Sequence, residues 1–270
     1  ATNACAAVFH CNQWSANISY NTINNNNGSG INHPTTNRGI FLFSASVGAS
    51  CTVNNNNLTI AGGTSTSAID WGVDCEMAQS GAAAGQVISI SNNTISMTKT
   101  VASTVAFTAI WVNSAATTVN VSGNTVNTFI YGGTGVSECI LSQLAGIGTL
   151  NINNNNFSGV SMTGATGSHY NIGVTATVVT ALNINGNVTN GVTLTGVTSK
   201  IWRGVYISTA AATCAHTVNS NTFQNISYSG GTPTGEFEFI YAAGSPASWT
   251  INSNSLIGSL TIPTTGTMYF

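Results

Sequence analysis

The sequence predicts an all-β solenoid whose strands stack into parallel sheets, and three observations lead to that prediction. A short phrase recurs eight times, with an aliphatic residue, Ser or Asn, any residue and then an invariant Asn. The successive Asn positions are 35, 37, 31, 31, 32, 34 and 33 residues apart, which is typical of a repeat architecture. The residues around each phrase alternate between apolar and polar, as in strands with one buried face. We therefore expect about eight coils of 31–37 residues.

The first strand of each coil ends at this phrase. Its aliphatic residue is expected to point inward, as are the residues two places earlier: Ala16, Cys51, Ile88, Val119, Leu150, Leu182, His216 and Trp249. Two places after the invariant Asn, the inward position is filled again by Ile23, Leu58, Ile95, Val126, Phe157, Phe223 and Leu256. In the sixth coil Val188 comes one place early and Thr189 takes that position, which predicts a local bulge.

A second strand begins 14 to 17 residues after each invariant Asn. Its third position is always aliphatic and β-branched: Ile40, Val73, Ile110, Ile140, Val174, Val205 and Ile240. The position before it is usually Gly or Ala, which suits a backbone that bends where there is little room. The variable segments between the two strands are expected to hold a third, less regular strand and surface loops.

The invariant Asn residues are predicted to form a ladder at one corner of the coil. They are Asn21, Asn56, Asn93, Asn124, Asn155, Asn187, Asn221 and Asn254. We expect Asn here because it tolerates the left-handed conformation of a tight turn and its amide can bond to the copies one coil away.

The phrases I/V-S/N-x-N-x-apolar and x-G-I/V resemble those of the right-handed parallel β-helix, or pectate-lyase-like, superfamily. The resemblance covers roughly residues 14–262 and implies a right-handed parallel β-helix. That superfamily includes polysaccharide lyases and hydrolases, phage tailspikes, adhesins and surface structural proteins. The resemblance therefore favours a fold and does not choose an activity.

Composition excludes several classes of function. Only 4% of residues are charged, against about a quarter in ordinary domains. Four basic residues are too few for a nucleic-acid-binding face, and no apolar run of about 18 residues could span a membrane as a helix. The start at Ala1 and six cysteines without zinc spacing favour an exported, extracellular or cell-surface protein. We predict a local disulfide between Cys5 and Cys11, whereas Cys51 and Cys75 fall at inward positions as small buried side chains.

Three acids gather in the second coil: Asp70, Asp74 and Glu76. Asp74 and Glu76 are two apart on a strand, so they share an outer face at about 7 Å. Together with Asp70 they could hold Ca²⁺, or the pair could supply the acid and base of polysaccharide cleavage. The alternative is that they are exposed acids that keep the chain soluble. The nearest basic residue is Arg38, and the acid and basic patterns of polygalacturonases and pectate lyases are not reproduced.

A few other polar residues have a predicted place. Arg203 and Glu238 occupy one column in adjacent coils about 4.8 Å apart, which predicts an ion pair between coils. His216 lies in an inward column and is expected to be a satisfied core residue, whereas His33 and His169 fall in predicted loops.

The fourth position of the second strand forms an outward column that is unusually large and apolar. Besides Asp74 and Thr175, it consists of Phe41, Trp111, Leu141, Tyr206 and Tyr241. Either a loop folds over this column, or it is a sugar-stacking or lateral contact surface, because large exposed apolar patches mark interaction sites.

These features favour a non-enzymatic subunit that stacks head to tail into an extracellular filament, sheath or surface layer. Little surface charge opposes association, and no amphipathic capping segment follows the last coil. We expect a cap or docking segment at residues 1–13, the β-helix at 14–263 and a short tail at 264–270. The expected partner is a second copy of the chain. The alternative is a glycan-binding or polysaccharide-cleaving protein that uses the aromatic column and the second-coil acids. Ice binding by a flat Thr-rich face is a third hypothesis, but no Thr-x-Thr ladder repeats through the coils to form such a face.

Overall fold

The computed structural model describes residues 5–11, 14–25, 36–44, 48–79, 85–196, 199–208, 211–229, 234–261 and 267–269. Over these residues the chain is a parallel β-solenoid of about seven turns without a helix, which confirms the predicted fold class. The eight rungs of the Asn ladder are separated by seven turns, close to the eight coils expected from the sequence.

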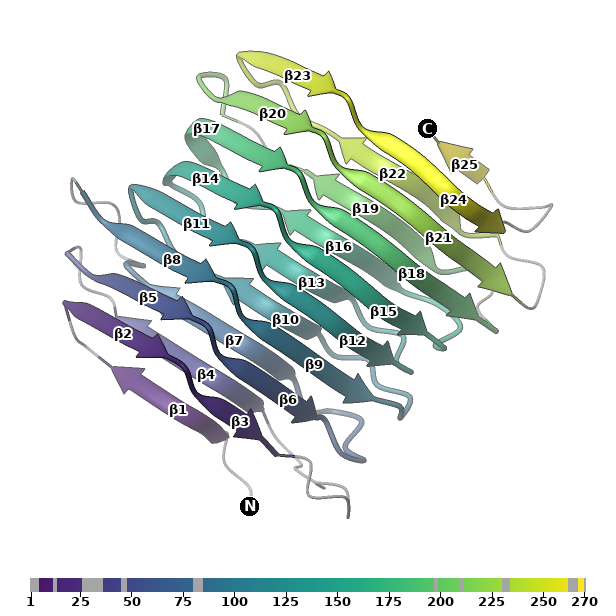
Figure 1. Ribbon diagram of the computed structural model, residues 1–270, viewed down its shortest axis with the longest axis horizontal. Helices are drawn as coiled ribbons and strands as arrows, with labels where there is room; N and C mark the ends of the chain where they lie inside the picture. Colours follow the sequence, from purple (N-terminus) through teal and green to yellow (C-terminus); the bar gives the residue numbers. More distant parts are fainter. Residues whose placement is uncertain are drawn as a thin grey trace.

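Each turn adds one strand to each of three parallel sheets (Figure 1). The first sheet contains β1 (Cys5–Cys11), β4 (Asn37–Ser44), β7 (Asp70–Met77), β10 (Phe107–Val112), β13 (Ser137–Ser142), β16 (Ser168–Val174), β19 (Ile201–Ile207), β22 (Glu236–Ala242) and β25 (Thr267–Tyr269). The second contains β2 (Ser15–Ser19), β5 (Ser50–Asn54), β8 (Val87–Ser91), β11 (Thr118–Ser122), β14 (Ile147–Asn153), β17 (Val178–Asn185), β20 (Ala215–Asn219) and β23 (Ser248–Asn252). The third contains β3 (Thr22–Asn24), β6 (Asn57–Ala61), β9 (Thr94–Lys99), β12 (Thr125–Tyr131), β15 (Asn156–Met162), β18 (Val188–Thr195), β21 (Thr222–Ser229) and β24 (Ser255–Thr261).

The third sheet follows directly from the alternation that continues past the ladder. In the second coil, β6 begins at Asn57, one residue after Asn56, and buries Leu58 and Ile60. The predicted third strand therefore exists in every coil, and it lies immediately after the ladder Asn.

The ladder Asn residues are hydrogen-bonded from coil to coil, as predicted. Asn93 Nδ2 donates to Asn124 Oδ1 at 2.9 Å and to the Val53 carbonyl at 2.9 Å. The backbone N–H of Asn93 donates to the same Oδ1 at 3.0 Å. The pattern repeats at every rung from Asn56 to Asn221. Each buried amide thus has partners on both sides, which avoids the free-energy cost of an unsatisfied polar group.

The left-handed residue at the corner is the one before the ladder Asn, so our assignment of that conformation to the Asn itself is wrong. These preceding residues have φ between 54° and 66°: Tyr20, Asn55, Asn92, Gly123, Asn154, Gly186, Ser220 and Ser253. They make the turn, and the ladder Asn is left free to direct its amide along the stack.

The prediction of a bulge in the sixth coil is also wrong. Thr189 pairs in register with Phe157 and Phe223 and occupies their inward position. Its hydroxyl is satisfied there, because Asn171 Nδ2 donates to Thr189 Oγ1 at 2.7 Å.

The second strand of the fifth coil is shifted by two residues from its predicted alignment. Ile172 pairs with Ile140 and Val205, so it fills the third position that the sequence pattern predicts for Val174. Both residues are aliphatic and buried, which is why the pattern alone did not separate them. The outward position beside Leu141 is consequently Gly173 and not Thr175.

His169 lies on β16 in the interior, which corrects its predicted place in a loop. Ser137 Oγ lies 3.0 Å from His169 Nδ1, and Asn171 Oδ1 lies 2.9 Å from His169 Nε2. Burial lowers the pKa of His169 to about 3, so the ring is neutral. His33 lies outside the described residues.

His216 is buried in its predicted column and contacts Trp249 edge to face, with ring centroids 4.5 Å apart. Neither ring nitrogen has a hydrogen-bond partner among the described residues. The expectation that His216 is a satisfied core residue is therefore only half right.

The predicted disulfide between Cys5 and Cys11 is wrong, because the two residues lie at opposite ends of the extended strand β1. Six residues of extended strand separate their Cα atoms by about 20 Å, far beyond the reach of a disulfide. Cys51 and Cys75 are buried, as their inward positions predicted.

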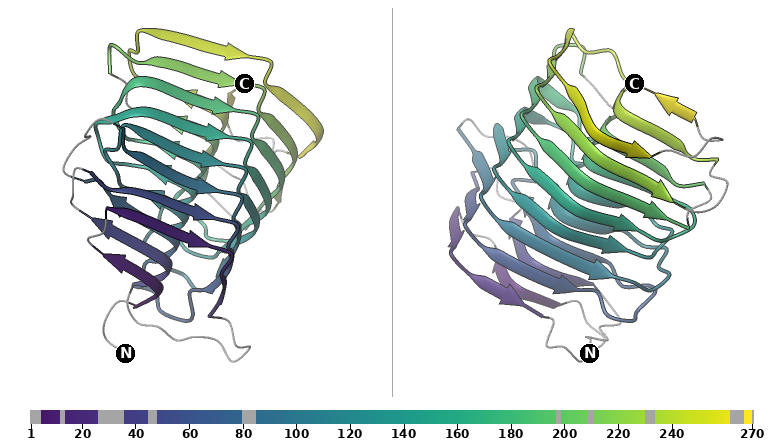
Figure 2. Two further views of the ribbon diagram at one scale, coloured as in Figure 1. Left: turned by 60° about the vertical axis from the view of Figure 1, so that its left-hand side comes forward. Right: turned by 45° about the vertical axis from the view of Figure 1, so that its right-hand side comes forward.

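The two ends of the described chain lie at opposite ends of the stack (Figure 2). Strands β1, β2 and β3 form one end, and β23, β24 and β25 form the other. None of the described residues forms a helix long and apolar enough to cross a membrane.

Candidate functional site

The outer face of the first sheet carries a cationic and aromatic cluster at its N-terminal end. The Arg38 guanidinium on β4 forms an ion pair with Asp74 on β7, with Nε donating to Oδ2. Its central carbon lies 4.1 Å from the ring centre of Phe41 and 4.7 Å from that of Trp71. Trp71 in turn stacks on Trp111, with centroids 4.8 Å apart. These contacts hold the guanidinium between aromatic faces, where cation–π attraction stabilises it.

Asp74 is the titratable centre of this cluster. Its side chain is fully buried, and its Oδ1 has no hydrogen-bond partner among the described residues. Burial raises the pKa of Asp74 to about 7, while Arg38 lowers it and Glu76 raises it further. A carboxyl with that pKa is suited to proton transfer at neutral pH, but a proton donor must also lie within reach of its substrate.

A hollow of about 440 Å³ lies beside this cluster at the edge formed by β1 and β4. It is lined by Cys5, Ala6, Phe9, Arg38 and Phe41. Phe9 is 59% exposed and stacks on Phe41 with centroids 5.1 Å apart. One face of Phe9 is covered by that ring, which leaves its remaining surface toward solvent.

A second cluster of the same kind lies toward the C-terminal end of the first sheet. Arg203 forms the predicted ion pair with Glu238 between adjacent coils and a further one with Glu236 at 3.2 Å. The pair with Glu238 is buried rather than exposed. The Arg203 guanidinium carbon also lies 4.2 Å from the ring centre of Tyr241 and 4.8 Å from that of Tyr206.

The predicted outward column is therefore divided between two clusters. Phe41 and Trp111 belong to the N-terminal cluster, and Tyr206 and Tyr241 belong to the C-terminal one. Leu141 lies between them, next to Gly173. All five predicted contact residues are half-buried, and the four aromatic ones each pack against another ring or a guanidinium group.

The three second-coil acids do not converge on one point. Asp70 forms a buried ion pair with Lys99, with Nζ 2.8 Å from Oδ2. Asp74 binds Arg38, and Glu76 accepts a hydrogen bond from Gln79 Nε2 at 3.2 Å. Within the described ranges no group of three or more His, Cys, Asp or Glu side chains could hold a metal ion, so these acids form no common calcium site.

Sequence reasoning missed two further titratable side chains. Glu138 on β13 is buried, accepts a hydrogen bond from Thr108 Oγ1 at 2.8 Å, and has its pKa raised to about 7 by burial. Lys200 is buried near the Tyr131 ring, and burial lowers its pKa to about 8. No motif marks either residue, and only the register of neighbouring coils shows that Glu138 lies between Thr108 and Tyr170.

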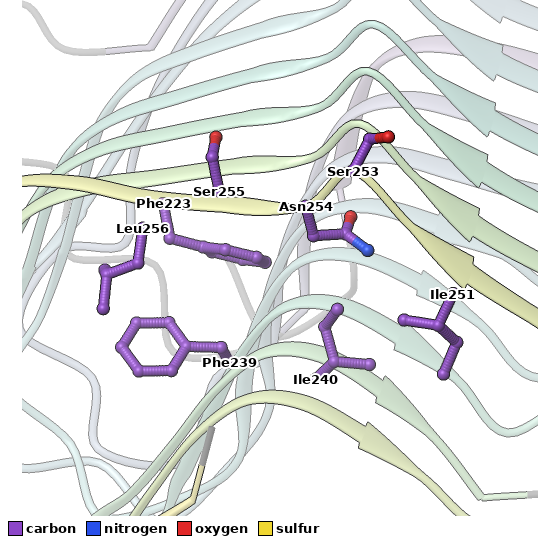
Figure 3. Close-up of a pocket in the computed structure, with 8 residues that line it drawn as sticks. All are labelled: Phe223, Phe239, Ile240, Ile251, Ser253, Asn254, Ser255 and Leu256. Atoms are coloured by element: carbon purple, nitrogen blue, oxygen red, sulfur yellow. The ribbon is translucent and has the colours of Figure 1, made fainter.

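The C-terminal end of the described solenoid is open, in the sense that its last coil exposes side chains that the earlier coils bury. Ile251 and Leu256 occupy inward columns of the last coil, yet they are 45% and 39% exposed. One coil earlier, Val218 and Phe223 in the same columns are buried. A hollow of about 340 Å³ opens at this end (Figure 3), lined by Phe223, Phe239, Ile240, Ile251, Ser253, Asn254, Ser255 and Leu256.

In comparisons with protein-family models, with curated proteins and with solved structures, the chain has no significant match.

Proposed function

We propose that this protein is a non-enzymatic structural subunit that self-assembles end to end into an extracellular filament, sheath or surface layer. The observation that carries the proposal is the C-terminal end of the described solenoid, where Ile251 and Leu256 lie in inward columns but are 45% and 39% exposed beside a hollow. Burying such side chains against a second copy is favourable by about 25 cal/mol per Å² of apolar surface.

The polarity of the Asn ladder supports head-to-tail stacking. In the bonds between ladder residues, the backbone N–H and Nδ2 of each Asn donate to Oδ1 of the following rung, and its own Oδ1 accepts from the preceding rung. Among the described residues, nothing accepts from the Asn254 backbone N–H, and nothing donates to Asn21 Oδ1. A second copy stacked in the same orientation would bring the donors of Asn254 to the acceptor of Asn21.

The parallel sheets also favour stacking in one direction. At the C-terminal end, β23 pairs only with β20, and β24 only with β21, among the described strands. Open strand edges template further pairing, and contacts that repeat in one direction build fibres instead of closed oligomers. With 4% charged residues and a formal net charge of −2, little electrostatic repulsion opposes this association.

We also propose that the chain belongs to the pectate-lyase-like superfamily of right-handed parallel β-helices and is exported. The repeated phrases and the x-G-I/V strands support the first statement. The low charge and the six cysteines support the second.

Electron microscopy and sedimentation of the purified protein test the assembly. We expect filaments whose formation Ile251→Lys abolishes, because a charge at the open end cannot be buried without a partner. The matched control is Val179→Lys, which places the same charge at a residue of similar exposure, 43%, in the middle of the solenoid. Wild-type protein that stays monomeric at high concentration, or equal disruption by both variants, would exclude end-to-end assembly.

The hollow beside Arg38 favours glycan binding as a second candidate function. The exposed ring of Phe9 next to the Arg38 guanidinium offers a stacking surface with hydrogen-bond donors at its edge, and the buried Asp74 carboxylate holds that guanidinium in place. Titration with a panel of polysaccharides should then show binding that Phe9→Ala removes and that Trp14→Ala, another exposed aromatic, leaves intact. Unchanged binding and cleavage in Asp74→Asn would remove the second-coil acid from any role with glycans.

A further inference from the structure

Two buried thiols face each other across the interior near the N-terminal end. Cys51 on β5 and Cys75 on β7 have their Sγ atoms 3.9 Å apart. Both side chains are buried, and their neighbours along the columns are apolar: Ala16 and Ile88 for Cys51, Leu42 and Val112 for Cys75. No other two cysteine sulfurs within the described part of the chain are in contact.

We propose that Cys51 and Cys75 form a disulfide that staples the second sheet to the first. A disulfide has sulfurs about 2.05 Å apart, so each Sγ must move by about 0.9 Å from the observed 3.9 Å. Rotation about the Cα–Cβ bonds can supply such a shift without moving the strands. The two residues are 24 apart in sequence and belong to the first and second strands of the second coil, so the bond would close a loop through β6.

The bond forms by thiol–disulfide exchange with a small-molecule disulfide such as oxidised glutathione. One protein thiolate attacks the small disulfide and releases one small thiol. The second protein thiolate then attacks the mixed disulfide and releases the other. Two protein thiols are oxidised, one small disulfide is reduced to two thiols, and the two protons go to those thiols or to solvent.

Burial of the two sulfurs limits the stage of folding at which this exchange can take place. The attacking species is a thiolate, and the neighbouring Cys75 thiol together with burial raises the pKa of Cys51 well above its ordinary value. In the folded protein both sulfurs are also closed to solvent. We therefore expect the bond to form while the coils close in an oxidising medium, and afterwards to resist reductant until the protein unfolds.

The few basic residues make a direct test possible. Trypsin cleaves after Arg38, Lys99, Lys200 and Arg203, so residues 39–99 form one peptide that contains Cys51 and Cys75 and no other cysteine. The protein is refolded with a mixture of oxidised and reduced glutathione, denatured in acid, alkylated without reductant and digested.

We expect peptide 39–99 to carry no alkyl group and to lack the mass of two hydrogen atoms. Cleavage before Asp70 should leave two pieces that separate only after reduction. In Cys75→Ala the peptide should carry one alkyl group, and in the control Cys214→Ala the link should persist. Peptide 39–99 with two alkyl groups, or a link to residues 1–38, would overturn the proposal.

A second measurement does not depend on any variant that must fold. Reductant added to the wild-type protein before heating should lower its Tm by several degrees when unfolding exposes the bond, and should not change the Tm of protein refolded in reductant. Equal Tm values for protein refolded with and without the glutathione mixture would contradict a stabilising link.

Discussion

The two ends of the solenoid bury the same columns to different extents. At the N-terminal end, Ile18 and Ile23 are each 8% exposed, although no strand of the described chain lies beyond β2 and β3. At the C-terminal end, Ile251 and Leu256 occupy the equivalent columns and are several times more exposed. The repeat treats these residues alike, so the difference comes from what surrounds each end and not from the coil itself.

This asymmetry limits the ways in which copies can associate. Two open C-terminal ends could meet face to face in a closed dimer, but the strands would then run in opposite directions, and the Asn254 donors of one copy would meet donors of the other. Head-to-tail stacking matches donors with acceptors, yet it must use an N-terminal end whose inward side chains are already covered. The exposed side chains of Trp14 and Tyr20 at that end offer apolar surface for such a contact.

Substitution of a ladder Asn should give the largest difference in stability between the middle of the solenoid and its C-terminal end. Asn124→Ala deprives the Asn93 backbone N–H and the Ile90 carbonyl of their partners in the interior. We expect a loss of about 4 kcal/mol in the free energy of unfolding, because each orphaned buried group costs about 1–3 kcal/mol.

At the open end, Asn254→Ala should cost only about 1 kcal/mol, because water can reach the groups that it leaves. Urea denaturation of the two variants measures both values. Equal losses would mean that Asn254 is as enclosed as the middle of the ladder, and the two ends would then be alike.

The second largest difference in stability should come from truncating an inward isoleucine at each end of the solenoid. Ile18→Ala should destabilise the protein by about 3 kcal/mol, since truncation of a buried isoleucine costs about 2–5 kcal/mol. Ile251→Ala should cost less than about 1 kcal/mol in dilute solution, where the side chain is half in water.

At concentrations that favour assembly, the cost of Ile251→Ala should rise toward that of Ile18→Ala, because the residue then becomes buried against another copy. Thermal unfolding at several protein concentrations gives the comparison. A cost that is independent of concentration would separate the open end from any self-association.

The sequence predicted the columns well because a strand with one buried face has a period of two, and the Asn phrase fixes its phase. It failed where two residues satisfy the same rule, as with Ile172 and Val174, or where a polar residue is inward because its partners lie in other coils, as with His169. It also placed Cys5 and Cys11 together because they are close along the chain, although an extended strand holds them apart. The different exposure of the two ends could not be predicted either, because the local pattern is the same at both.

The smallest expected effect is a loss of folding stability in acid, which should appear in the strands of the open end before those of the N-terminal end. His216 lies on β20, one coil from that end, and burial alone lowers its pKa. A histidine whose pKa is lower in the folded state binds a proton more readily when unfolded, so folding stability falls as the pH falls below about 6.5. Acid should therefore speed hydrogen exchange of the amides in β20 and β23 before those of β2 and β5. His216→Leu should abolish this acid sensitivity, because it keeps an apolar side chain in the column and removes the titrating group. If His216→Leu retained the acid-induced exchange of β20 and β23, that exchange would have to come from the titration of another group, and the prediction would be wrong.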